Sequence, residues 1–200
     1  MFSNLPKKLM YFLVLTGNGI LSLAQSVQYF PPFDMTVAAN QTLQLAGKVE
    51  NNYLLYHTQP GTIPELMVFN EQGQIAGVSS LDFIRPGFAH RVNMVTLPNR
   101  LNLIVQEIRE HTHYVFVAGL NKDGKLRESI HYIDSTRIDL YGAAAYYNVI
   151  SSADKKYSLL YRIIQGFSSI QILFNGILLN EKNEILGSAS FYIPFNTELE

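Results

Sequence analysis

The sequence predicts an all-β protein, an antiparallel β-sandwich built from hairpins. Apolar residues alternate with polar or small residues over strand-length segments such as residues 114–120 and 185–195, and a period of two places successive side chains on opposite faces of a strand. The chain also holds 12 Tyr and 12 Phe, which suit half-buried sheet surfaces. The third observation behind this fold class is a turn motif that occurs three times.

The repeated motif is predicted to be a β-hairpin turn. It occurs at residues 69–75 (FNEQGQI), 120–126 (LNKDGKL) and 179–185 (LNEKNEI). A type I turn favours Asn at its first position, and the residue after the turn takes a left-handed conformation that suits Gly or, less easily, Asn. Because Gly73, Gly124 and Asn183 occupy that position, each copy predicts a hairpin with a three-residue loop and a bulge.

Further strand-like segments lie between these hairpins, at residues 42–46, 53–57, 92–96, 101–108, 137–141 and 157–164. Short strands separated by polar turns favour a sandwich, whereas a propeller would need more blades than this length supplies. We expect a first β-sandwich half or domain at residues 35–98 and a second at residues 99–200, forming either one unit or two joined sub-domains.

The first 24 residues differ from the rest of the chain. Lys7 and Lys8 precede an apolar segment that ends in Ser22-Leu23-Ala24, which is typical of a cleaved secretory signal peptide. A retained membrane helix is the alternative, but Gly17-Asn18-Gly19 interrupts a segment that is shorter than the roughly 20 apolar residues of a bilayer span. We expect a signal peptide at residues 1–24, an extended arm at residues 25–34 and no transmembrane segment in the mature chain.

Charge and cysteine content narrow the class of protein. The formal net charge is −1 and the chain has no cysteine. A mildly acidic chain without a Lys/Arg cluster lacks the electrostatic character of a nucleic-acid binder. An exported protein without cysteine folds without disulfides, which favours a bacterial periplasmic or secreted protein over a disulfide-stapled extracellular module.

Histidines form the strongest candidate for a metal site. If Asn121 pairs with Lys125 across the hairpin, His113 lies opposite Ile133 and Val115 lies opposite His131. His111, His113 and His131 then share one face of the sheet, with His113 and His131 roughly 5.5–8 Å apart. Paired imidazoles on strands can bind zinc or copper. The alternative is an exposed polar face lying opposite a core face made by Tyr114, Phe116, Leu120, Leu126, Ile130 and Tyr132.

Other chemistry is poorly supported by the sequence. A calcium loop at residues 119–130 would have only Asp123 with Asn121 and the distant Glu128, too few ligands for the ion. Glu107 and Glu110 are a weak candidate pair for glycoside hydrolysis and fit a solvated strand end better. We therefore expect no catalytic or cofactor-binding residue and no cofactor. Aromatic residues such as Tyr146, Tyr147 and Phe167 are candidates for an interaction surface, because tyrosine and phenylalanine are favoured at protein interfaces.

Three segments resemble a known family. They are residues 45–51 (LAGKVEN), 66–73 (LMVFNEQG) and 84–87 (IRPG). In this order they resemble the immunoglobulin-like FxLYD-type domains of bacterial envelope proteins, with Leu66 in place of the Phe and Asn70 in place of the Asp. Residues 140–148 and the hairpin at Asn180 resemble a second, more divergent copy. The resemblance implies an immunoglobulin-like β-sandwich used for interaction, with no catalytic residues.

Together these observations predict an exported, non-enzymatic interaction or assembly module of the bacterial cell envelope, such as an accessory part of an envelope-spanning or secretion machine. Its partners would be other envelope proteins or its own copies. The alternatives are a periplasmic or secreted binder or hydrolase of small molecules or carbohydrates, which would use a cleft between the sheets, and a histidine metal-binding protein.

Overall fold

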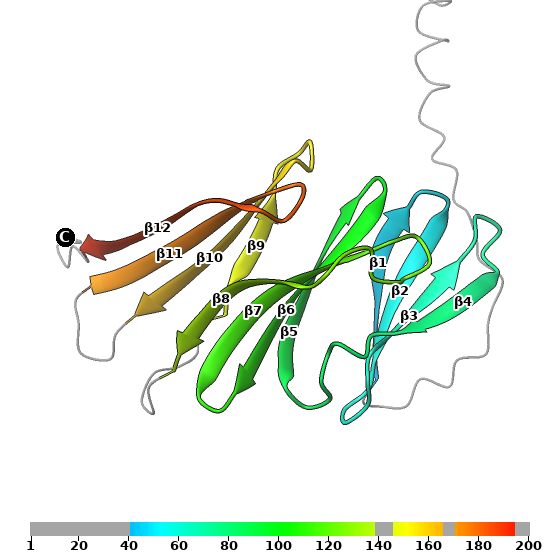
Figure 1. The fold of residues 1–200 in the computed structure, drawn as a ribbon, viewed down its shortest axis with the longest axis horizontal. Coiled ribbons are helices and arrows are strands. Elements are labelled where there is room, and N and C mark those ends of the chain that lie inside the picture. Colours follow the sequence, from blue (N-terminus) through cyan, green and yellow to red (C-terminus); the bar gives the residue numbers. More distant parts are fainter. Residues whose placement is uncertain (1–40, 139–145, 166–170, 195–200) are drawn as a thin grey trace, which may run out of the picture. The chain divides into compact units, whose positions relative to one another are not determined.

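The computed structural model describes residues 41–138, 146–165 and 171–194, all within one compact unit, Pro32–Glu200 (Figure 1). These residues form twelve β-strands and no helix. The described residues therefore contain no helix that is long and apolar enough to cross a membrane. The prediction of an all-β, antiparallel protein is confirmed.

The strands form three four-stranded sheets, each made of four consecutive strands that run antiparallel as a meander. Sheet 1 contains β1 (Thr42–Val49), β2 (Asn52–Thr58), β3 (Glu65–Phe69) and β4 (Ile75–Ser80). Sheet 2 contains β5 (Ala89–Leu97), β6 (Arg100–Arg109), β7 (Thr112–Leu120) and β8 (His131–Arg137). Sheet 3 contains β9 (Asn148–Ser151), β10 (Tyr157–Gln165), β11 (Gln171–Asn180) and β12 (Ile185–Pro194).

This topology differs from part of the sequence prediction. Strands neighbouring in sequence are neighbours in each sheet, so the described residues do not show the immunoglobulin-like order, in which Greek-key connections distribute the strands between two sheets. The expected boundary between residues 98 and 99 lies in the turn between β5 and β6, inside sheet 2. The expected strand at residues 137–141 overlaps the end of β8 only at Arg137, and residues 139–141 lie outside the described ranges.

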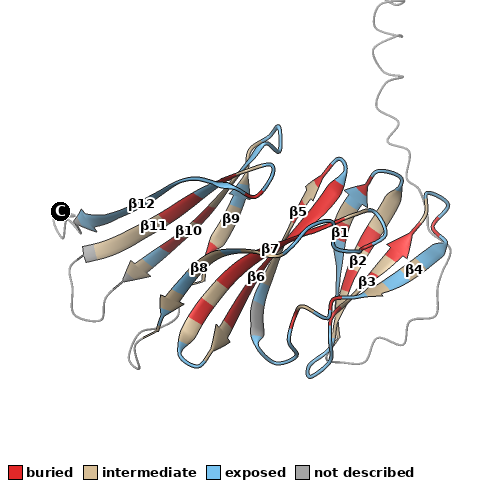
Figure 2. Cartoon of the chain, viewed as in Figure 1, coloured by how far each residue is buried: buried red, intermediate tan, exposed pale blue. Residues whose placement is uncertain are grey.

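Sheet 2 lies between the other two and is covered on both faces. One cluster packs sheet 1 against sheet 2, and its central members are Leu54, Tyr56, Leu66, Val68, Leu101, Leu103, Val105, Phe116 and Leu120. A second cluster packs sheet 2 against sheet 3, with Val95, Ile104, Val115, Val117, Tyr147, Leu160, Ile177 and Leu179. Figure 2 accordingly shows buried residues concentrated in β6 and β7. We call the face of a sheet that looks toward the following sheet its front face, and the opposite one its back face.

The three hairpins have the predicted geometry. The Oδ1 atoms of Asn70, Asn121 and Asn180 each accept hydrogen bonds from the backbone N–H groups two and four residues later, at 2.9–3.0 Å. Gly73 and Gly124 have φ of 74° and Asn183 has φ of 64°. The prediction of Asn-initiated turns is confirmed, and Asp123 lies within such a turn. Each turn joins the third strand of a sheet to the fourth, so the repeated hairpin marks a repeated sheet.

Candidate interaction surface

The structure does not bring the three candidate histidines together. Val117 lies opposite His131 and His113 lies opposite Thr136, so His113 and His131 are four residues apart along the β7–β8 ladder. The predicted register was wrong for two reasons. The bridge from Leu120 to Leu126 matches it, but residues 127–130 shift the pairing, and a bulge between Val115 and Phe116 shifts it again.

The surroundings of the histidines also differ from the expected exposed face. His113 is only 1% exposed, and its ring lies 5.6 Å from the Tyr146 ring and 6.2 Å from the Tyr147 ring. His111 is exposed and occupies the β6–β7 turn with φ of 61°. Across the described ranges, no group of three or more His, Asp or Glu side chains is placed to hold a metal ion.

The three aromatic residues predicted to form an interaction surface do not lie together on an exposed surface of the described chain. Tyr147 is 2% exposed and belongs to the cluster between sheets 2 and 3, so within this chain it is a core residue. Its hydroxyl donates to Asp134 Oδ2 at 2.9 Å, and the Arg162 guanidinium lies 4.5 Å from its ring centre. Burial raises the pKa of the Tyr147 phenol. Tyr146 is half-buried, and Phe167 lies outside the described residues.

Glu107 was expected at a solvated strand end and instead is 2% exposed. It lies in β6 of the central sheet, where its Oε2 is 3.1 Å from Arg109 Nε. Arg109 in turn covers the Tyr114 ring at 4.4 Å. Glu110, in the following turn, is exposed with φ of 47°. The ion pair with Arg109 offsets only part of the cost of burying the Glu107 carboxylate, because among the described residues Glu107 Oε1 has no hydrogen-bond partner.

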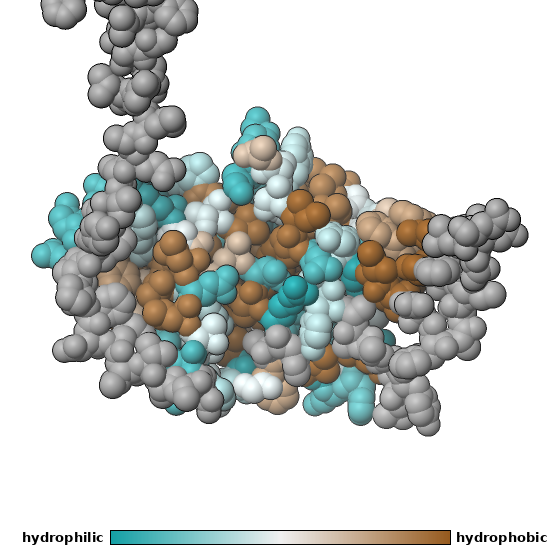
Figure 3. All heavy atoms as spheres, turned by 180° about the vertical axis from the view of Figure 1, so that it is seen from behind, coloured by the Kyte–Doolittle hydropathy of each residue, from teal (hydrophilic) through white to brown (hydrophobic). Residues whose placement is uncertain are grey.

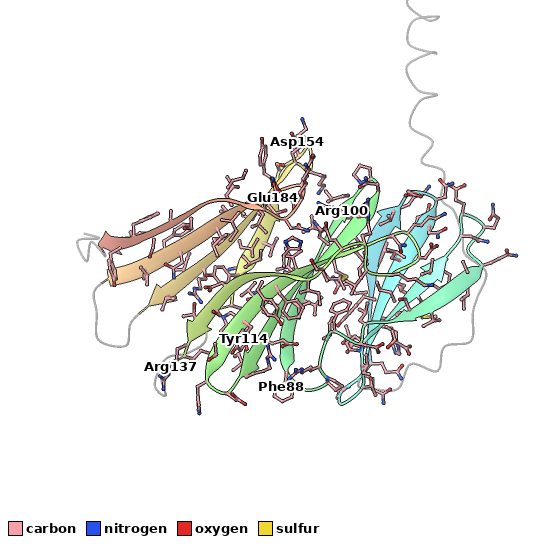
Figure 4. All side chains as sticks on the ribbon, viewed as in Figure 1. Phe88, Arg100, Tyr114, Arg137, Asp154 and Glu184 are labelled. Atoms are coloured by element: carbon pink, nitrogen blue, oxygen red, sulfur yellow. The ribbon has the colours of Figure 1, made fainter. Side chains whose placement is uncertain are left out.

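A hollow of about 410 Å³ lies where turns of sheets 2 and 3 meet. Charged side chains dominate its lining: Arg100, Arg127, Asp154, Lys155, Lys156, Glu181 and Lys182. Figure 4 labels Arg100 and Asp154 at this end. Arg100 pairs with Glu128 at 3.2 Å, and burial lowers the Arg100 pKa although Glu128 opposes that shift. The hollow is formed by turn and strand-end residues. A second hollow, of about 460 Å³, lies between sheets 1 and 2 and is lined by residues such as Gln44, Tyr56, Arg91 and Val92.

The back face of sheet 1 is apolar and exposed. Residues directly opposite each other in a sheet share a face, and one complete row across this face is Leu45, Leu55, Met67 and Val78. Leu45 is 63% exposed and Val78 is 56% exposed. The neighbouring exposed Leu43 and Ile75 extend this surface. Burying such side chains would stabilise a complex by roughly 1.5–3 kcal/mol per fully buried residue.

The front face of sheet 3 is a second apolar surface. One row holds Ile150, Leu159, Leu178 and Gly187, and another holds Ile163, Phe174 and Phe191. Ile163 and Phe191 are 53% and 50% exposed. The Phe174 ring stacks on Phe191 at 4.9 Å and on Tyr161 at 6.2 Å. Figure 3, which views the molecule from behind, shows hydrophobic residues at the surface on the side of sheet 3, at the right of the picture.

Charge distinguishes these faces from an ordinary solvent-exposed sheet. In the described strands of sheet 3, the residues whose register places them on the front face include no Asp, Glu, Lys or Arg. On the back face of sheet 1, Lys48 and Glu65 lie in the rows on either side of the apolar row. Contiguous exposed apolar surface bordered by polar residues is characteristic of protein interaction sites.

Comparisons with known proteins add little to this picture. No protein-family model matches the chain, and no curated protein matches it. Among solved structures, the chain is similar to the WD40 domain of SCAP from fission yeast, with 8% sequence identity and a TM-score of 0.37. The similarity covers 74% of this chain and 39% of that chain, so this chain spans less than half the length of the WD40 domain. At this TM-score we infer neither fold nor function from the similarity.

Proposed function

We propose that this chain is a non-enzymatic assembly module of the bacterial cell envelope, which binds protein partners through the back face of sheet 1 and the front face of sheet 3. The observation that carries the proposal is the exposure of apolar side chains on these two faces, including Leu45 and Val78 on one and Ile163 and Phe191 on the other. Faces of this kind are stable in water only when they are small or covered by a partner.

Binding to partners is tested by cross-linking in envelope fractions followed by mass spectrometry. The wild-type chain is compared with a variant carrying Leu45→Lys and Ile163→Lys, since a lysine on each face opposes burial of that face. Ile63→Lys is the control, because Ile63 is a 41% exposed aliphatic residue in the β2–β3 loop. We expect specific cross-links with the wild type and the control but not with the double variant. Cross-links that persist in the double variant would overturn the proposed role of the faces.

Export is the second part of the proposal and rests on the signal-peptide pattern of residues 1–24. Expression in a Gram-negative host followed by fractionation and N-terminal sequencing tests it. We expect periplasmic or secreted protein that begins at Gln25. Protein found in the cytoplasm with residues 1–24 retained would contradict export.

A further inference from the structure

The three sheets have the same four-stranded meander topology, and each has an Asn-initiated turn after its third strand. These turns allow equivalent positions in the three sheets to be identified. Phe69, Leu120 and Leu179 each precede the turn Asn, so they hold equivalent positions. Counting back two residues from each gives Met67, Ala118 and Ile177. The rows through these residues are Leu45–Leu55–Met67–Val78 in sheet 1, Met94–Leu103–Ala118 in sheet 2 and Val149–Leu160–Ile177–Ser188 in sheet 3.

This row lies on the back face of every sheet but is covered in only two of them. In sheet 2, Leu103 and Met94 pack against sheet 1, and Ala118 is fully buried. In sheet 3, Leu160, Ile177 and Val149 pack against sheet 2. In sheet 1 the equivalent row is equally apolar, yet Leu45 and Val78 are exposed by 63% and 56%. The back face of sheet 1 therefore has the composition of a surface that receives the front face of another sheet.

The front faces of sheets 1 and 2 are covered by the following sheet, whereas the front face of sheet 3 is exposed. The equivalent front rows are Gly47–Leu54–Val68–Gly77, Val95–Asn102–Gly119 and Ile150–Leu159–Leu178–Gly187. Leu54 and Val68 are buried under sheet 2, and Val95 is buried under sheet 3. Ile150 and Leu178 remain 54% and 38% exposed. Among the described sheets, the front face of sheet 3 is the one that no following sheet covers.

The connections between sheets repeat as well. The turn that starts at Asn121 contacts sheet 1, where Ser79 Oγ donates to the Gly124 carbonyl at 2.9 Å and Asn52 Nδ2 donates to the Lys122 carbonyl at 3.2 Å. The turn that starts at Asn180 contacts sheet 2, where Asn102 Nδ2 donates to Asn183 Oδ1 at 2.8 Å. The turn that starts at Asn70 has the same geometry, but no sheet of the described chain precedes it.

We propose that a second copy of the chain supplies the two missing neighbours. The front face of sheet 3 in each copy packs on the back face of sheet 1 in the other, so that two chains close a ring of six sheets. This inference rests on the proposed assembly function and names its partner. Each of the two interfaces in this ring would repeat the front-to-back packing that joins sheet 1 to sheet 2 and sheet 2 to sheet 3. Such a head-to-tail interface either closes into a ring or grows into a filament.

The number of sheets favours closure by two copies. Rings of radially arranged four-stranded sheets contain about four to eight sheets. Three sheets from one chain fall below that range and nine from three chains exceed it, whereas six from two chains lie within it. Packing sheet 3 on sheet 3 would instead bring two front faces together, an arrangement for which the chain offers no internal precedent.

Sedimentation velocity and light scattering of the purified full chain test the ring. We expect a mass twice that of one chain of the same preparation. Leu45→Lys damages only the back face of sheet 1 and Leu178→Lys only the front face of sheet 3. Each is expected to halve the mass to that of a monomer, while the control Ile63→Lys remains a dimer. Because Leu45 and Leu178 are exposed within the chain, circular dichroism should show that both variants keep the wild-type strand content.

Mixing the two variants distinguishes this interface from others. In a mixed dimer, the intact front face of the Leu45→Lys chain meets the intact back face of the Leu178→Lys chain, so one of the two interfaces is restored. We expect dimers in the mixture although neither variant forms them alone. A symmetric interface that used only one of the faces would be insensitive to one of the two substitutions, and that result would overturn the proposal.

A monomeric wild-type chain at all concentrations would also overturn the ring, whether the faces are then covered by residues before 41 or by another protein. If a monomer still gave envelope cross-links that depend on Leu45 and Ile163, the assembly function would stand with a different partner. If the ring formed and the cross-links in envelope fractions joined only copies of this chain, the ring would stand and the proposed binding to other envelope proteins would fail.

Discussion

Gln106 and Tyr147 join sheet 2 to the chain entering sheet 3 through two buried hydrogen bonds. Gln106 Nε2 donates to the Tyr147 carbonyl at 2.8 Å, and the Tyr147 N–H donates to Gln106 Oε1 at 2.8 Å. One side chain thereby satisfies both backbone polar groups of a residue that is 2% exposed. Buried backbone groups need such partners, so Gln106 fixes where the chain enters sheet 3.

Replacing Gln106 by Leu is expected to lower the free energy of unfolding by about 2–4 kcal/mol, because it leaves both backbone groups of Tyr147 buried without these partners. Chemical denaturation measures the change. The control is Gln72→Leu at an exposed turn position, which we expect to change stability by less than about 0.5 kcal/mol. Equal effects of the two substitutions would show that the Gln106 contacts contribute nothing specific.

Tyr147 should make stability depend on alkaline pH. Burial, as the main cause, and Asp134 raise the pKa of its phenol above the ordinary value of 10.0, while Arg162 opposes the shift. The unfolded chain therefore loses this proton at a lower pH than the folded chain, and the free energy of unfolding decreases as the pH rises above about 10. We expect the free energy of unfolding, measured by chemical denaturation between neutral pH and pH 11, to decrease less steeply with pH for Tyr147→Phe than for the wild type. The same slope for Tyr147→Phe and the wild type would contradict this prediction.

Asn183 differs from Gly73 and Gly124 because its side chain has a partner in the preceding sheet. The amide of Asn102 donates to Asn183 Oδ1 at 2.8 Å, and each of these residues is 4% exposed. Glycine is better suited to φ of 64°, yet Asn183→Gly would leave the buried Asn102 amide without this acceptor. We expect Asn183→Gly to destabilise by about 1–2 kcal/mol despite the relief of backbone strain. Adding Asn102→Leu should recover part of that loss in a double-mutant cycle, and purely additive effects would argue against the coupling.

Gly47 is expected to be essential for the packing of sheet 1 against sheet 2. Its φ is 139°, and a Cβ placed there would overlap Thr96, whose hydroxyl donates to the Ala46 carbonyl at 2.6 Å. Gly47→Ala should therefore destabilise by about 2–4 kcal/mol through backbone strain and overpacking. Gly77→Ala is the matched control, since a Cβ at Gly77 meets nothing within 4 Å. Similar thermal unfolding of both variants would disprove the close approach.

Local features of this fold could be predicted from the sequence. The Asn121 turn and its two relatives depend on hydrogen bonds between residues at most four positions apart, so their chemistry is contained in the motif. The alternation of residues 185–195 likewise predicted a strand, which the structure shows as β12 (Ile185–Pro194). Alternation does not identify the surface that covers each face of a strand. It therefore did not predict that three sheets pack on one another or that the back face of sheet 1 and the front face of sheet 3 are exposed.

The candidate sites depended on register, which the sequence constrains less. Residues 127–130 and the bulge at Val115 displaced His113 from its expected partner, and a shift of this kind has no clear signal in a short polar segment. Burial of His113 had a better signal. Residues 103–105 (LIV) and 115–118 (VFVA) are apolar on both faces, which indicates strands covered on both sides. That signal also points to a central sheet, and hence to neighbours for the outer ones.

The front-to-back contact between two copies is the central claim, and it can be tested by cysteine cross-linking because the chain has no cysteine of its own. Within the chain, Gly47 on a front face lies against Thr96 on a back face. Ile150 is equivalent to Gly47, and Lys48 is equivalent to Thr96. A ring would therefore place Lys48 of one copy beside Ile150 of the other.

The measurement is the cross-linking of a variant that carries Lys48→Cys and Ile150→Cys with a short bis-maleimide. Its control carries Ile63→Cys and Ile150→Cys, which places one thiol in a loop outside both faces. We predict covalent dimers for the Lys48→Cys/Ile150→Cys variant and monomers for the control on denaturing gels. Monomers for both variants, or the same yield of dimer from both, would contradict the ring.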